Sequence, residues 1–147
     1  MNWAHVHLMI NHFPVVGVFG ATALLVYALA RKSEEIKRVS FGLFVLLALI
    51  TLAVFFTGQA AQDTVKKLPG VTEASIDTHE EMAEYALVFI ETLGLAALAG
   101  LLFLRVSGAI PRWLVVIVLL LSLVTAAVVG VTANLGGQIR HTEIRGQ

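Results

Sequence analysis

The sequence predicts an all-α integral membrane protein, a four-helix bundle with both termini on the outer side of the membrane. Of its 147 residues, 58% are hydrophobic and 14% are charged, whereas a typical globular domain is about 45–50% apolar and about 25% charged. The charged residues are also clustered, and the stretches between the clusters are long enough to cross a hydrocarbon core, which takes about 20 helical residues. Ten basic and ten acidic residues leave no net charge to attract nucleic acid, and no cysteine is present to form a disulfide or a thiolate metal site.

Four spans are predicted within a single transmembrane domain that covers residues 1–147: residues 11–30, 39–60, 80–104 and 113–138. The first, second and fourth contain no Asp, Glu, Lys or Arg, and beyond residue 81 the third contains only Glu84 and Glu91. Glycine and alanine are frequent in the spans, and small residues let helices approach closely in lipid. A compact bundle is therefore expected.

The first span is predicted to be interrupted near its start. Pro14 has no N–H to donate to the carbonyl one turn earlier, so the helix proper is expected to begin at Asn11, with this asparagine as its N-cap. Residues 1–10 then fold across the mouth of the bundle and carry His5 and His7 with them. The alternative is a straight helix that carries both histidines further from the membrane.

The predicted outer loop, residues 61–78, precedes the third span. Thr78 and Glu81 have the spacing of a capping box, so the third helix is expected to begin at Thr78. The short connections 31–38 and 105–112 hold six of the ten Lys and Arg residues, which favours a cytoplasmic position for both. The loop 61–78 and both termini then face the periplasm, and the predicted location is the inner membrane of a bacterium.

All five histidines lie at this outer end: His5, His7, His12, His79 and His141. Imidazole binds haem iron and also Zn, Cu and Fe ions, and a bundle can direct such ligands into its interior. The alternative is that these side chains are simply hydrated at the membrane surface, because no spacing matches a strong metal motif. At about 1.5 Å per residue, His12 lies about 10 Å below the other four.

A second group of polar residues lies deeper. Glu91 is about 21 Å from the inner end of its helix, and Thr51 and Thr125 are at nearly the same depth. Glu84 shares a helix face with Glu91 but lies near the outer boundary, where Asn134 is also expected. An intramembrane carboxyl group is a candidate for carrying protons, binding a cation, or contacting a quinone or a haem. The alternative is a protonated side chain that hydrogen-bonds Thr51, Thr125 or a backbone carbonyl and holds helices together.

Two stretches of the chain together resemble a bacterial family of small four-span membrane proteins of unknown function. They are His5-Val6-His7-Leu8-Met9-Ile10-Asn11-His12-Phe13-Pro14 and Gly136-Gly137-Gln138-Ile139-Arg140-His141. Shorter similar segments between them are Thr57-Gly58, Leu68-Pro69-Gly70-Val71 and His79-Glu80-Glu81. Some members of this family look fused to Rieske-type iron–sulfur domains, which implies a role in respiratory electron transfer. The resemblance implies His12, His79 and His141 as candidate metal ligands.

The sequence thus predicts a small cytochrome-like protein that binds haem b through histidines near the outer face. Its electrons would be exchanged with a quinone or a periplasmic protein. His5, His7 and Arg140 are further candidates for contacts with the cofactor. The alternatives are a membrane protein that binds Zn, Cu or Fe, and a non-catalytic accessory subunit of a respiratory complex. No catalytic residue is assigned, and the choice between a monomer and a homo-oligomer stays open.

Overall fold

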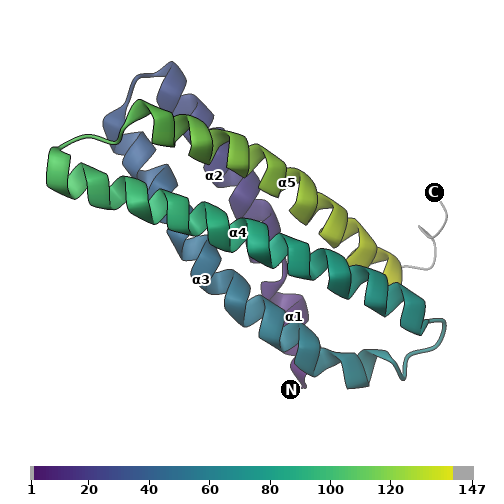
Figure 1. Ribbon diagram of the computed structural model, residues 1–147. Coiled ribbons are helices and arrows are strands. Elements are labelled where there is room, and N and C mark those ends of the chain that lie inside the picture. Colours follow the sequence, from purple (N-terminus) through teal and green to yellow (C-terminus); the bar gives the residue numbers. More distant parts are fainter. Residues whose placement is uncertain (1, 141–147) are drawn as a thin grey trace.

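The structure, a computed structural model, describes residues 2–140 and is built there from α-helices alone (Figure 1). These are α1 (Trp3–Ile10), α2 (His12–Ala30), α3 (Glu34–Val65), α4 (Glu73–Ser107) and α5 (Arg112–Arg140). Four segments are long and apolar enough to cross a membrane: Trp3–Ala30, which joins α1 and α2, Glu34–Val65, Glu73–Ser107 and Arg112–Ile139. The all-α class and the four helical segments of span length are confirmed.

The helices form an up-and-down bundle. Helix α3 packs against α4, α4 packs against α5, and α2 closes the ring by contacting both α3 and α5. The N-terminus and the α3–α4 connection lie at one end of the bundle, and the α2–α3 and α4–α5 connections lie at the other (Figure 1). The short helix α1 lies against α3 at the first of these ends, which we call the histidine end because α1 carries His5 and His7.

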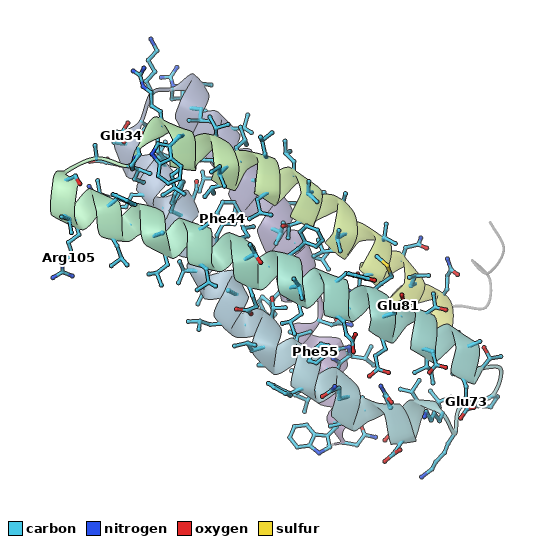
Figure 2. All side chains as sticks on the ribbon, in the orientation of Figure 1. Glu34, Phe44, Phe55, Glu73, Glu81 and Arg105 are labelled. Atoms are coloured by element: carbon cyan, nitrogen blue, oxygen red, sulfur yellow. The ribbon has the colours of Figure 1, made fainter. Side chains whose placement is uncertain are left out.

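The middle of the bundle is apolar both inside and outside. Every helix of the ring contributes fully buried side chains to one core, among them Val18, Leu25, Phe41, Phe44, Ile90, Leu93, Val118 and Val129. The outward faces also carry large apolar side chains, such as Val16 and Leu95, as is typical of helices that face lipid. Figure 2 shows the labelled charged residues at the two ends, with Glu34 and Arg105 at one and Glu73 and Glu81 at the other.

Close contact between helices depends on small residues. A Cβ atom on Gly94 would lie 2.5 Å from the Cβ of Ala48 on α3, so these two helix backbones meet directly. A Cβ on Gly100 would overlap the ring of Phe41. Such approaches are how helices gain dispersion contacts in lipid, where the surroundings are as apolar as the side chains.

Helix α4 begins earlier than the sequence predicts. Its N-cap is Thr72, whose hydroxyl accepts from the backbone N–H of Ser75 at 3.2 Å, and the connection between α3 and α4 is residues 66–72 rather than 61–78. Thr78 is not an N-cap: its hydroxyl donates to the carbonyl of Ala74 at 2.8 Å, inside the helix. The earlier start buries Ile76, which supplies apolar burial that a start at Thr78 would not gain.

The predicted interruption of the first span is present. Helix α1 ends at Ile10 and α2 begins at His12, as expected from the missing N–H of Pro14. Asn11, however, does not act as an N-cap, because its backbone is in the helical region and its side chain makes no capping hydrogen bond. Its own N–H still bonds to the carbonyl of His7 at 2.9 Å. The joint is therefore a kink between two helices rather than a new start.

Candidate cofactor site between two histidines

His7 is held against helix α3. Its Nδ1 lies 3.1 Å from the carbonyl oxygen of Val54 and 3.4 Å from the hydroxyl of Thr57. The imidazole also lies directly on Gly58, where a Cβ atom would be 3.0 Å from the ring carbon Cε1. The hydrogen bond and the contact with glycine together fix both the position and the tilt of the ring.

His79 is held against helix α5 in the same way. Its Nδ1 lies 3.1 Å from the carbonyl oxygen of Thr132, and its Cε1 would lie 3.0 Å from a Cβ on Gly136. The hydroxyl of Thr132 in turn donates to the carbonyl of Met82 on α4 at 3.1 Å. Two hydrogen bonds in opposite directions therefore join α4 and α5 beside this histidine.

The two histidine environments repeat each other although the sequence shows no internal repeat. In each half of the chain a histidine bonds to a carbonyl on a neighbouring helix and packs on the glycine four residues further along that helix. The carbonyl and glycine are Val54 and Gly58 on α3 in one half, and Thr132 and Gly136 on α5 in the other. One histidine would suffice to join two helices. Two equivalent ones join two different pairs of helices, α1 to α3 and α4 to α5.

The hydrogen bonds also assign the tautomer of each ring. A carbonyl oxygen can only accept, so Nδ1 of both His7 and His79 carries the proton and donates it. In a neutral imidazole the other nitrogen, Nε2, is then left with a free lone pair. A backbone carbonyl on Nδ1–H is one of the common partners of a metal-bound histidine, because it orients the ring and makes Nε2 a stronger donor to the metal.

Both histidines line one cavity at the histidine end of the bundle. Its volume is about 340 Å³, within the range of small-molecule and cofactor sites. Most of the lining is apolar, including Phe55, Ile90 and Val129, and all five helices contribute to it. His7 and His79 are close enough for a charge on one to act electrostatically on the other. The free Nε2 atoms therefore belong to two nearby rings on a single cavity.

The other histidines predicted as ligands are placed differently. His12 lines the same cavity but is exposed, and its side chain makes no hydrogen bond within residues 2–140. His5 is exposed on α1 and does not line the cavity. His141 lies outside the described residues, as does the side chain of Arg140, the last residue of α5. Of the three ligands implied by the resemblance, only His79 has an orienting hydrogen bond in the described part of the chain.

Glu91 does not form the hydrogen bond to Thr51 or Thr125 that the sequence analysis considered. The hydroxyls of Thr51 and Thr125 each donate at 2.7 Å to a carbonyl of their own helix. Glu91 is half-buried, and its Oε1 is enclosed without a hydrogen-bond partner in residues 2–140. Glu84 is exposed, and Asn134 is exposed and accepts from Gln138 at 2.6 Å.

The described residues hold no cluster of three or more His, Asp or Glu side chains suited to a metal ion. Zinc and similar ions need about three or four protein ligands in such a site. A haem needs at most two, because the porphyrin supplies the other four nitrogens. Within residues 2–140, the cavity donors with an orienting hydrogen bond are thus the imidazoles of His7 and His79.

Several residues of this site have no role in the sequence-based prediction. Val54 and Thr132 act through their backbone carbonyls, which no side-chain pattern reveals. Gly58 and Gly136 belong to the motifs of the resemblance, but the sequence assigns them no role. One signal was present: His7 and His79 come out at the same estimated height, whereas His12 comes out about 10 Å lower. Equal height would have separated His12 from His79, but it would not have distinguished His7 from His5 and His141, which come out level with His79 as well.

Comparison with known proteins adds no further assignment. No protein-family model, curated protein or solved structure matches this chain, so the family resemblance of its motifs stays a prediction.

Proposed function

We propose that this protein is a small membrane cytochrome that binds one haem b through His7 and His79 and takes part in electron transfer. The observation that carries the proposal is the matched pair of imidazoles, each with Nδ1–H bonded to a backbone carbonyl and Nε2 free, on one largely apolar cavity. Haem bound there would supply one-electron redox chemistry. His7 and His79 would hold it through their Nε2 atoms, and the cavity would supply an apolar enclosure.

The glycines and the cavity support the same proposal. Gly58 and Gly136 have no Cβ, which would otherwise crowd the imidazole of His7 or His79. Each ring can therefore lie directly on the backbone of the neighbouring helix. Lys66 and Lys67 follow α3 directly at the histidine end, where cations can meet the propionates of a haem. Arg140 ends α5 at the same end and is a third candidate for such a contact.

The proposal extends to the membrane. Four apolar segments of span length support a multi-pass protein, and the cation-rich short connections support a bacterial inner membrane with the histidine end on the periplasmic side. The site would then lie at the outer boundary of the hydrocarbon layer. From there it could exchange electrons with a quinone in the membrane or with a periplasmic protein.

The test is an absorption spectrum of the full chain purified from haem-replete cells. We expect a Soret band that is lost in both His7→Ala and His79→Ala and retained in the matched control His5→Ala, whose exposed ring does not line the cavity. Because loss could also follow from misfolding, a His79→Gly variant should regain the band when imidazole is added to the solution.

The remaining outcomes separate the alternatives. A colourless wild-type protein would overturn the haem proposal. Zinc, copper or iron found by elemental analysis in that colourless protein would favour the metal-binding alternative. A colourless and metal-free protein would favour an accessory subunit without a cofactor.

A further inference from the structure

The end of the bundle opposite the histidine end carries most of the positive charge. Six of the ten Lys and Arg residues lie there, together with only two of the ten acidic residues, Glu34 and Glu35. Figure 2 shows Arg105 at this end, with its side chain directed away from the bundle. We call this the cation end, and its six basic residues are Arg31, Lys32, Lys37, Arg38, Arg105 and Arg112.

Among residues 2–140, five of these six cations have no partner. Lys37 is the exception, because its ammonium group donates to Glu34 at 2.6 Å. The other five are exposed, and their side chains form neither an ion pair nor a hydrogen bond with the described residues. Six cations and two carboxylates leave a net charge of +4 at this end. Most of that charge is therefore open to a partner outside the chain.

The unpaired cations are spread around the bundle. Each of the four helices of the ring contributes an exposed arginine: Arg31 caps the end of α2, Arg38 lies in the second turn of α3, Arg105 lies in the last turn of α4, and Arg112 begins α5. Packed helices lie about 8–10 Å apart. One phosphate ion therefore cannot contact all four arginines, whereas a ring of lipid headgroups around the bundle can.

Exposed aromatic rings mark the level at which lipid headgroups would lie. Tyr27 is 52% exposed one turn before Arg31, and Trp113 is 57% exposed directly after Arg112. The ring of Trp113 lies edge-on to that of Phe103 on α4, with 6.3 Å between the ring centres. Tyrosine and tryptophan gather where hydrocarbon meets the headgroups. The arginines lie just beyond these rings, at the level of the lipid phosphates.

The histidine end has the opposite balance of charge. From Asp63 to Glu84 the chain contains six acidic residues and two basic ones, Lys66 and Lys67. Basic residues near a membrane surface attract anionic lipids, and acidic residues repel them. An anionic lipid would therefore be favoured around one end of the bundle and disfavoured around the other.

We propose that the cation end binds a ring of anionic phospholipids, whose phosphates contact the exposed arginines Arg31, Arg38, Arg105 and Arg112. The ligand is a lipid whose headgroup has a net negative charge, such as phosphatidylglycerol. Arginine suits this contact because one guanidinium can donate two hydrogen bonds to one phosphate. The inference goes beyond the proposed function and does not depend on haem, since the arginines lie at the end away from the histidines.

The experiment uses the full chain in vesicles of phosphatidylglycerol and phosphatidylcholine in equal amounts, with bromine on the acyl chains of one lipid at a time. Bromine quenches the fluorescence of a nearby tryptophan, so the two quenching signals give the relative affinity of the lipids there. Trp3→Phe leaves Trp113 as the only tryptophan, at the cation end. One cation near an anionic surface changes lipid binding about fivefold. We expect phosphatidylglycerol to be preferred around Trp113 by at least that factor.

The matched control moves the tryptophan to the other end. Phe56 is 63% exposed on α3 and lies about 27 Å along the helix from Arg38. The variant Phe56→Trp, combined with Trp3→Phe and Trp113→Phe, reports on the lipids near the histidine end. We expect no preference for phosphatidylglycerol there. Equal affinity of the two lipids around Trp113, or the same preference at both ends, would overturn the proposal.

A second comparison removes charge while Trp113 remains the reporter. Arg105→Gln with Arg112→Gln takes two cations from the cation end, and Lys66→Gln with Lys67→Gln takes two from the histidine end. All four side chains are exposed, so their replacement leaves the core intact. We expect the first pair to bring the preference close to one and the second pair to leave it unchanged. An unchanged preference in the first pair would contradict the assignment to the arginines.

Inorganic phosphate distinguishes a lipid headgroup from a free anion. It is added to Trp3→Phe in the same vesicles, and a chloride salt of equal ionic strength serves as the control. We expect the two salts to lower the preference for phosphatidylglycerol equally, because both only screen charge. A preference that is lost in phosphate and kept in chloride would overturn the lipid proposal in favour of a site for free phosphate.

Discussion

Adding a methyl group at Gly136 tests the proposed site without touching either histidine. In Gly136→Ala the new Cβ would lie 3.0 Å from Cε1 of His79 and 3.4 Å from its Nδ1. Carbon atoms prefer a separation of about 3.5–4.0 Å, so the imidazole must retreat by about 0.5–1 Å. The hydrogen bond to Thr132, now 3.1 Å long, then approaches or passes the length of about 3.5 Å beyond which it no longer counts as one.

Loss of the partner that orients a metal-bound histidine lowers metal affinity by about 10–100-fold. That factor corresponds to about 1.4–2.7 kcal/mol in the free energy of haem binding. We therefore expect haem to bind to Gly136→Ala about 10–100 times more weakly. The assay is a titration of haem-free protein with haem, followed by the growth of the Soret band.

The matched control is Gly130→Ala on the same helix. A Cβ there would meet only the ring of Phe19, at 3.8 Å, which is an ordinary contact. Both variants gain the higher helix propensity of alanine, so their difference isolates the contact with His79. Wild-type haem affinity in Gly136→Ala, or an equal loss in both variants, would refute the reasoning.

Three further predictions concern the bundle itself. Gly94→Ala should lower the free energy of unfolding in detergent by about 1–3 kcal/mol, because its Cβ would lie 2.5 Å from that of Ala48 and the two helices would have to separate. Glu91→Met should raise it by about 1–3 kcal/mol, because the buried Oε1 has no hydrogen-bond partner within residues 2–140. The chain has no native cysteine, so single cysteines report sidedness: an impermeant maleimide on intact cells should label Ala74→Cys and spare Glu35→Cys.

Each of these three predictions has a result that would contradict it. Gly42→Ala is the control for Gly94→Ala because nothing lies within 4 Å of its Cβ position, and equal unfolding curves for the two would show that the helix contact is not tight. A less stable Glu91→Met would show that the carboxyl group has a partner in the membrane. Labelling of Glu35→Cys alone would reverse the proposed orientation.

The helices and their order were predictable because their signal is local. A stretch such as residues 113–138 is apolar and long enough to span whatever surrounds it, and the break before Pro14 depends on one missing N–H. The start of α4 was predicted wrongly because it depends on contacts with the rest of the bundle and not on the local sequence alone. Both Thr72 and Thr78 can cap a helix, and the choice depends on burying Ile76 against the rest of the bundle.

The sequence by itself thus determined four apolar helices and a histidine-rich end. Only the tertiary structure decided that His7, and not His12, has the same environment as His79. That choice depends on how far each helix is rotated and shifted along its neighbour, since the ring must reach the carbonyl of Val54 or Thr132 and lie on a glycine. Helices that are apolar on every side carry almost no pattern that specifies such a rotation. The close contacts between backbones specify it instead.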